Sequence, residues 1–281
     1  MGSVRIVTDS ACDMPKALLE ANSIDVVPLT IRFGSDEYTD GVDLSTAEFW
    51  KRCSESTRLP ETAAPAPGAF HEAFDRAVAD GCDAVVAITL SSKLSGTYQA
   101  AVVAAESMGA SIEVHVVDSK MVTAAQGLLC LEAAEHAARG DDAAAIAERA
   151  RSRSATAGLV GTLDTLEHLV KGGRVSSAKA MLGSLLSVKP ILVLRDGEIV
   201  EDGRQRTRGR ALEHVAARTE AAAPFDWLAV GGGDASDLRV VVDRLRNVET
   251  THPLIETEIG PVVGAHGGPG VVGVCWLARS R

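Results

Sequence analysis

Residues 84–99 read Ala-Val-Val-Ala-Ile-Thr-Leu-Ser-Ser-Lys-Leu-Ser-Gly-Thr-Tyr-Gln. The stretch begins as an apolar, β-branched run typical of a buried strand and leads into an Ala-rich helix that starts near Tyr98. Serines and Gly96 separate the two elements. A strand followed by a helix is the repeating unit of a parallel sheet, and the first half of the chain repeats this unit. The sequence therefore predicts an α/β fold.

Four runs are predicted as strands of this sheet: Val4–Val7, Ile24–Phe33, Ala84–Thr89 and Glu113–Val117. Three of them end in small polar residues, namely Thr8-Asp9-Ser10, Leu90-Ser91-Ser92 and Asp118-Ser119. Open α/β sheets bind ligands outside the carboxyl ends of their strands, so we expect these polar tips to face one crevice. We also expect Asp13 to cap the helix after the first tip, because Pro15 suits the first turn of that helix.

The second half changes character after an Ala-rich helix around Ala133–Ala150, where the run from Arg151 to Thr156 is typical of an exposed connection. We therefore predict two lobes, residues 1–155 and residues 156–281. The elements predicted in the second lobe are a strand Gly158–Thr162, helices around Leu163–Val170 and Ser177–Leu186, a hairpin Ile191–Leu194 and Glu198–Glu201, a helix Ala211–Glu220, a strand Trp227–Val230, a helix Asp237–Val248 and a strand Ile255–Ile259. A Gly-rich segment follows.

The composition is that of an ordinary globular protein and argues against several classes of function. The net charge of −10 repels a phosphate backbone, so we expect no nucleic-acid partner. The five cysteines are widely spaced and form no Cys-x-x-Cys pair, which is typical of buried thiols in a reducing compartment. No apolar run approaches the roughly 20 residues of a membrane span. We therefore expect a cytoplasmic protein.

The sequence lacks the motifs of common cofactor sites. It contains no Gly-x-x-x-x-Gly-Lys-Ser/Thr loop, and Gly231-Gly-Gly-Asp-Ala-Ser does not have the dinucleotide spacing. No two histidines lie four residues apart, and the cysteines do not cluster. His266-Gly-Gly-Pro-Gly is superficially similar to an esterase oxyanion loop, but no Gly-x-Ser-x-Gly elbow occurs. We therefore expect that the protein binds no nucleotide, metal or other cofactor and that it is not a serine hydrolase.

The hydroxyl groups of residues 90–99 point to an anion site. A helix N-terminus offers unpaired N–H groups and a positive dipole, to which Ser92, Ser95 and Thr97 could add donors. Capping an ordinary helix needs only one hydroxyl, so the surplus favours a site for carboxylate or phosphate.

Two further segments carry single candidates. Thr62 is predicted in a Pro-rich loop, where a rigid turn is the simpler interpretation. His266 is predicted in a Gly-rich loop that permits close approach of a ligand, although a lone histidine is usually structural.

Four arginines, Arg204, Arg206, Arg208 and Arg210, alternate with other residues. An extended backbone would project all four to one side, where like charges repel each other. A solvated surface strip is the simplest interpretation. In a protein of net charge −10, the strip could also contact phosphate or an acidic partner.

Seven motifs, in this order, resemble those of the DegV family. They are Val7-Thr-Asp-Ser, Thr62-x-x-Pro, Leu90-Ser-Ser-x-Leu-Ser-Gly-Thr-Tyr, Val117-Asp-Ser, Lys171-Gly-Gly-Arg-Val-Ser, Lys189-Pro-Ile and Gly260-Pro-x-x-Gly-x-His. The resemblance implies a two-lobe fold, with a parallel, Rossmann-like sheet lobe followed by a second α/β lobe and a fatty acid between them. In the best-understood members a separate kinase phosphorylates the bound acid. The implied partners are a long-chain fatty acid, a fatty acid kinase subunit and, transiently, a membrane surface.

The resemblance also assigns roles to individual residues. The residues it places at the fatty-acid carboxylate are Thr62, Ser95, Ser92, Gly96 and His266. Arg174 and Arg206 resemble basic residues on the phosphoryl or partner side. The chain departs from the usual Thr-Ser-Gln-Pro of the family by reading Thr62-Ala-Ala-Pro, which removes two polar neighbours of the head group.

Two alternative functions stay open from the sequence. One is an acyl or phosphoryl transferase that uses Ser95 as the nucleophile and His266 as the base, although no third, orienting residue is evident. The other is a lipid buffer or sensor that binds the acid without a kinase.

Overall fold

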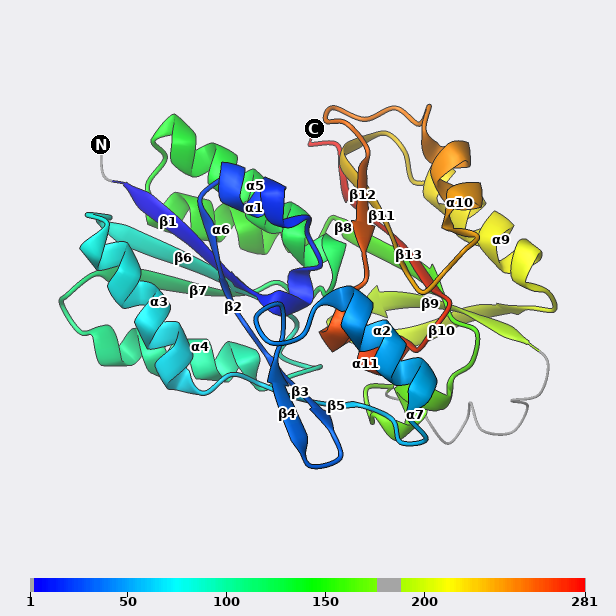
Figure 1. The fold of residues 1–281 in the computed structure, drawn as a ribbon. Helices are drawn as coiled ribbons and strands as arrows, with labels where there is room; N and C mark the ends of the chain where they lie inside the picture. The colour runs from blue at the N-terminus through cyan, green and yellow to red at the C-terminus, as the bar shows by residue number, and fades with distance from the viewer. Residues whose placement is uncertain (1–2, 176–187, 281) are drawn as a thin grey trace.

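The computed structural model describes residues 3–175 and 188–280, and two large sheets dominate it (Figure 1). The first sheet is parallel, with four strands in the order β2-β1-β6-β7. Its strands are β2 (Ile24–Val27), β1 (Val4–Asp9), β6 (Ala84–Thr89) and β7 (Glu113–Asp118). The chain leaves β1 toward one edge and β6 toward the other, so the loops after these neighbours diverge. Such a switch point opens a crevice at the carboxyl edge of the sheet.

Helices cover both faces of the parallel sheet (Figure 1). The helices on one face are α3 (Pro67–Ala79) and α4 (Thr97–Met108), and those on the other are α5 (Ala124–Arg139) and α6 (Ala143–Ser154). A short 3-10 turn η1 (Ser10–Cys12) and helix α1 (Lys16–Ala21) connect β1 to β2. The predicted α/β class and the parallel sheet are confirmed.

The second sheet has six strands in the order β10-β9-β8-β13-β11-β12 and is antiparallel except for the β11–β12 pair. Its strands are β10 (Glu198–Gln205), β9 (Lys189–Arg195), β8 (Ala157–Thr162), β13 (Val271–Ala278), β11 (Phe225–Gly233) and β12 (Ile255–Glu258). Helices α9 (Arg208–Glu220) and α10 (Leu238–Leu245) pack on its outer face through a core that includes Phe225 and Leu228.

Smaller elements lie where the two large sheets meet (Figure 1). They are a three-stranded antiparallel sheet of β4 (Asp36–Thr39), β3 (Thr30–Phe33) and β5 (Glu61–Ala63), together with helices α2 (Thr46–Glu55), α7 (Glu167–Lys171) and α11 (Pro261–Gly267). The predicted division into residues 1–155 and 156–281 stays a prediction, although the first sheet ends at Asp118 and the second begins at Ala157.

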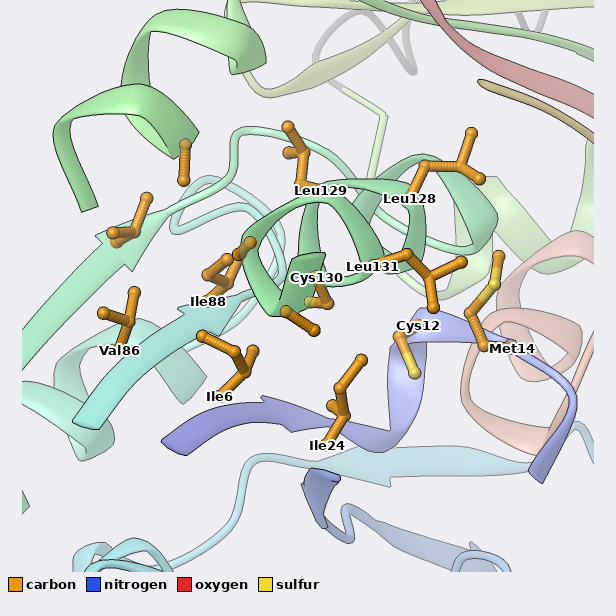
Figure 2. Packing of buried hydrophobic residues seen from close by; sticks show 14 of the residues in the cluster. Ile6, Cys12, Met14, Ile24, Val86, Ile88, Leu128, Leu129, Cys130 and Leu131 are labelled. Atoms are coloured by element: carbon orange, nitrogen blue, oxygen red, sulfur yellow. The ribbon is translucent and has the colours of Figure 1, made fainter. Parts of the chain in front are cut away.

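Helix α5 lies between the two large sheets and is buried from Ala124 to Ala134. Figure 2 shows its residues Leu128 and Cys130 in the same cluster as Ile6 and Ile88 of the parallel sheet. The same cluster continues into the second sheet through Ala229 and Cys275. A helix with apolar residues on every side is suited to such a position.

Two long elements predicted from the sequence are each divided in the structure. The predicted strand Ile24–Phe33 is wrong because Pro28 has no N–H for the ladder, and β2 and β3 belong to different sheets. The predicted single helix Ala133–Ala150 is also wrong. Gly140 ends α5 in the left-handed conformation, and the Asp142 carboxylate caps α6 by accepting from Ala145 N at 2.7 Å.

Three further expectations also need correction. Asp13 does not cap α1, because its buried carboxyl turns inward and bonds to other elements. The Gly-rich segment is not a plain loop, since it contains α11 and leads into strand β13, which lies inside the second sheet. The predicted helix near Leu163 begins only at Glu167, and the predicted helix Ser177–Leu186 lies outside the described residues.

The four arginines do not form an extended strip. Thr207 caps α9 by accepting from Arg210 N, so Arg208 and Arg210 lie on a helix while Arg204 lies on β10. Arg204 pairs with Glu201, and Arg208 pairs with Asp237 at 2.8 Å. The cap breaks the alternation on which the prediction depended.

The cysteines and helices agree with the expectations from composition. All five cysteines are free thiols, and Cys12, Cys130 and Cys275 are buried. Among residues 3–175 and 188–280, none of the helices combines the length and apolarity that crossing a bilayer requires.

Arg153 fastens α6 to both α5 and the second sheet, which leads to a stability prediction. Its guanidinium bonds to Glu132 at 2.9 Å and Asp226 at 3.0 Å, and it donates to Ala278 O at 2.7 Å. Because Arg153 and Glu132 are both buried, Arg153→Ala leaves the Glu132 carboxylate with only the half-buried Arg149, whose Nη2 lies 3.0 Å from Glu132 Oε1. We expect a loss of about 3–5 kcal/mol in the free energy of unfolding, measured by urea denaturation.

The control is Arg151→Ala in the same helix, whose arginine forms an exposed pair with Glu148. It should cost less than about 1 kcal/mol. Similar losses for the two variants would show that the Arg153 network does not stabilise the fold.

Candidate functional site

An apolar cavity lies between the parallel sheet and the second sheet. The loops at the carboxyl edge of the first sheet form one wall, and strands of the second sheet form the other. The apolar residues of the first wall are Leu29, Leu90, Leu94 and Val122. The apolar residues of the second include Leu159, Leu163, Leu192, Leu194, Val271 and Val272, and α11 adds Val262 and Val263. The cavity therefore lies where the strand order predicts a crevice.

A few polar side chains converge on this cavity, from four different parts of the chain. Thr62 comes from β5, Ser95 from the loop before α4, Arg174 from the segment after α7 and His266 from α11. Thr62 Oγ1 and His266 Nε2 are 2.9 Å apart and form a hydrogen bond. An apolar cavity with a few convergent polar groups is the usual form of a small-molecule site.

The Gly-Gly-Arg segment holds His266 in place. A Cβ atom at Gly172 would lie 2.4 Å from His266 Nδ1, so only glycine lets the backbone approach the ring this closely. Within the part of the chain that the structure describes, His266 Nδ1 is buried without a hydrogen-bond partner. The imidazole is thus clamped between the chain at Gly172 and the Thr62 hydroxyl.

His266 is held in its neutral form. Burial, together with the nearby Arg174 guanidinium and His168, lowers its pKa from 6.5 to about 4. The ring is therefore uncharged near neutral pH. A neutral imidazole can donate from one nitrogen only, and His266 Nε2 already bonds to Thr62.

The three candidate hydroxyls before α4 have different environments. Ser95 lines the cavity, and its hydroxyl bonds to Thr97 Oγ1 at 2.8 Å. Thr97 is fully buried as the first residue of the helix. Ser92 turns away, because its hydroxyl and N–H both bond to the Asp118 carboxylate. Gly96 packs beside Ala64 rather than on the cavity wall. Of this group, only Ser95 is placed to meet a ligand in the cavity.

The structure separates the two candidate arginines. Arg174 lines the cavity and bridges two loops, donating to Leu94 O at 3.3 Å and Gly172 O at 2.6 Å. Arg206 is exposed just beyond the end of β10. Ile199, near the start of β10, pairs with Val175, the neighbour of Arg174. About 20 Å of strand therefore separates the part of β10 near Arg174 from Arg206.

Buried carboxyl groups fix the loops of the first wall. Asp9 accepts from Leu90 N at 2.8 Å and from Ala11 N at 3.1 Å, which joins the loops after β1 and β6. Asp13 accepts from Thr123 Oγ1 at 2.6 Å and from Gly260 N at 2.9 Å, which joins η1, α5 and α11. Burial raises the pKa of Asp9 to about 6 and that of Asp13 to about 8.

A polar recess adjoins the apolar cavity and shares Thr62, Arg174 and His266 with it. The charged residues and the further histidine that line this recess are Arg58, Glu61, Glu167, His168 and Lys171. Lys171 pairs with Glu167 at 2.6 Å. Thr62, Arg174 and His266 therefore lie at the boundary between the apolar cavity and the charged recess.

Sequence reasoning missed several features of the site. Thr62 lies on strand β5, paired with Ile31, rather than in a loop, and His266 lies on a short helix. The role of Gly172 was also missed. Its signal was the Gly-Gly pair, but the packing partner is far away in sequence. In the described residues, no cluster of three or more His, Cys, Asp or Glu side chains has the geometry to hold a metal ion.

Comparisons with known proteins agree on one family. A family model described as "Uncharacterised protein, DegV family" matches residues 3–279. A DegV domain-containing protein of Streptomyces coelicolor is 38% identical, with 98% of this chain and 99% of that protein covered.

Two solved structures share the fold over almost all of the chain. One is the crystal structure of DegV, described as a fatty acid binding protein from Bacillus subtilis, with a TM-score of 0.88 at 30% identity. The match covers 99% of this chain and 100% of that one. A stearic acid-binding protein from Eubacterium ventriosum has a TM-score of 0.82 at 29% identity, with 98% of each chain covered.

The clamp on His266 leads to a prediction that NMR can check. In the wild type, the ring signals of His266 should titrate with a midpoint near pH 4, the value that burial imposes. Gly172→Ala should push the ring out of its place, because the added Cβ would overlap Nδ1. The pKa should then rise toward the ordinary 6.5.

Gly209→Ala is the control, since a Cβ at this exposed glycine meets no described atom within 4 Å. It should leave the midpoint unchanged. A midpoint near 6.5 in the wild type would mean that His266 is hydrated, contrary to its position in the structure.

Proposed function

Because this chain belongs to the DegV family and its apolar cavity ends in hydroxyl and imidazole groups, we propose that it binds a long-chain fatty acid and presents the carboxylate to a partner kinase. The observation that carries the proposal is the Thr62–His266 hydrogen bond at the edge of a leucine- and valine-lined cavity. Two similar structures are described as binding fatty acids, one of them stearic acid.

The cavity lining supports an acyl chain as the ligand. Burial of each CH₂ group contributes about 0.8 kcal/mol, so a long chain gains most of its affinity from the tail. Leucines and valines from both sheets supply that environment, and among the described lining residues only Arg174 at the polar end carries a charge. A short polar ligand would gain nothing from these walls.

The polar end supports a carboxylate head group. A neutral His266 that donates its Nε2 proton to Thr62 Oγ1 leaves the Thr62 hydroxyl proton free for the ligand. Ser95 supplies a second hydroxyl on the cavity wall, and Arg174 supplies a positive charge. Hydrogen bonds of this kind offset the cost of burying a carboxylate, which otherwise amounts to several kcal/mol.

The recess beside the head group supports approach of a phosphoryl donor from that side. Arg58, Lys171 and Arg174 line it, and the chain as a whole carries a net charge of −10. Phosphorylation of the carboxylate adds negative charge, which local cations stabilise. Arg206 stays a second proposed contact for the partner, at a site farther along β10.

The geometry favours binding and presentation over the transferase alternative. A nucleophilic Ser95 would need a base within hydrogen-bonding reach, but His266 bonds to Thr62 and Ser95 bonds to Thr97. With a pKa of about 4, His266 is also a weak base at neutral pH. A lipid buffer without a kinase would use the same cavity and differs only in lacking the second step.

The first test of the proposal concerns the ligand and its head group. Mass spectrometry of material released from the purified protein should identify a long-chain fatty acid. Titration with that acid should show that Ser95→Ala weakens binding by about 1–3 kcal/mol, because a buried carboxylate loses one donor. Ser92→Ala should have a smaller effect, since the Ser92 hydroxyl bonds to Asp118.

Ser107→Ala, which removes a hydroxyl bonded to Ala104 O within α4, is the control for hydroxyl loss elsewhere. Absence of any bound or bindable fatty acid would refute the proposal. Unchanged affinity in Ser95→Ala would place the carboxylate elsewhere in the cavity.

The second test concerns the kinase step. Arg174→Ala should slow acyl phosphorylation by a cognate kinase at least tenfold more than it weakens fatty-acid binding. The removed guanidinium acts on the phosphoryl group, and charged hydrogen bonds contribute about 1.5–3 kcal/mol. The measurement pairs a binding titration with a phosphoryl-transfer assay.

Arg206→Ala, tested with the same two assays, examines the expectation from the sequence that this arginine also serves the phosphoryl step. Equal losses of binding and transfer in Arg174→Ala would mean that Arg174 holds the acid only. No transfer by the wild type with any kinase would leave a lipid buffer as the function.

A further inference from the structure

Strand β13 supplies one wall of the cavity, and its alternation shows where that wall stops. Side chains alternate between the faces of a strand, so Val271, Gly273 and Cys275 face the same way. Val271 and Gly273 line the cavity, whereas Cys275 is 2% exposed and packs in the cluster that contains α5. Gly273 is therefore the last residue of this strand to line the cavity.

The order of residues along β13 also gives the cavity a direction. Val271 lies next to the head-group end, because a Cβ at Gly267, the neighbour of His266, would be only 3.2 Å from Val271 Cγ2. From there the wall passes Gly273 and ends at the packed Cys275. A chain with its carboxylate near Thr62 and His266 would thus extend toward Gly273.

Gly273 is the one point on this strand face where a side chain is missing and space is open. A Cβ atom built on it meets no described atom within 4 Å. Its cross-strand partner Gly161 is different, since a Cβ there would lie 3.0 Å from the carbonyl oxygen of Val272. Gly161 is required by close backbone packing, whereas Gly273 leaves volume free inside the cavity.

We infer that Gly273 determines how long an acyl chain the cavity accepts. The inference rests on the proposed fatty-acid function and adds a residue that sets its specificity. A side chain at this position would occupy the deep part of the cavity and shorten it from that end. The head-group residues Thr62, Ser95 and His266 belong to the opposite end and would keep their places.

The test compares wild type, Gly273→Ala and Gly273→Val in titrations with straight-chain fatty acids from dodecanoic to octadecanoic acid. Wild-type affinity should rise about fourfold per added methylene, which is the equivalent of about 0.8 kcal/mol, until the chain fills the cavity. In Gly273→Val, the three added carbons should move this plateau to a shorter chain length. They should also lower the affinity for the acid that fills the wild-type cavity by a factor on the order of 50. Gly273→Ala should weaken it about fourfold.

Valine suits a strand position, and the shortest acid that binds wild type should bind both variants equally well, which shows that they fold. Gly68→Ala, at an exposed helical glycine with no described atom within 4 Å of an added Cβ, should leave the profile unchanged. Two outcomes would overturn this inference alone, provided that wild type binds the acids. One is an identical plateau in wild type and Gly273→Val, and the other is an equal loss of affinity for all acids in Gly273→Val. Wild type that binds none of them would overturn the proposed function and, with it, this inference.

Discussion

The burial of α5 between two sheets is the constraint on which the rest of the structure depends. A helix normally buries one stripe of side chains, but α5 packs against the parallel sheet on one side and against β11 and β13 on the other. Gly127 shows how tight this packing is, since a Cβ there would lie 2.3 Å from Met14 Cγ. The helix sets the distance between the sheets where it is present. Beyond its N-terminus at Thr123, α5 no longer fills the space between the sheets, and the cavity begins there.

Buried polar links hold the two walls of this cavity in register. Asp13, whose pKa burial raises to about 8, bonds to both Thr123 and Gly260 and so connects the start of α5 to the helix that carries His266. The Ser91 hydroxyl donates to Gly197 O at 2.7 Å, which ties the loop before α4 to the β9–β10 turn. Each link joins residues distant in sequence. Moving either wall would leave buried polar groups without partners, at a cost of about 1–3 kcal/mol each.

The sequence predicted those parts of the protein that local patterns determine. The strand Ala84–Thr89, the strand Glu113–Val117, which the structure extends to Asp118, and the hairpin of Ile191–Leu194 and Glu198–Glu201 all carry their signals within a few residues. Strand β13 was missed because its Gly and Pro neighbours suggest a loop, whereas its ladder partners β8 and β11 come from other parts of the chain. The Thr62–His266 bond spans 204 residues, and no local pattern encodes it. Ser92 resembles Ser95 in sequence, yet the nearby Asp118 draws its hydroxyl away from the cavity.

The proposed carboxylate ligand would account for a polar end that combines neutral donors with the cation Arg174. Burial in an apolar cavity raises the pKa of a carboxylic acid, but only the ionised form has an oxygen ready to attack phosphorus. In the proposed complex, the hydroxyl donors Thr62 and Ser95 would stabilise the anion without neutralising it. A charged histidine at position 266 would bind the carboxylate more tightly and make it less reactive. Burial keeps the pKa of His266 near 4, so in the proposed phosphoryl transfer the positive charge where the cavity meets the polar recess would come from Arg174.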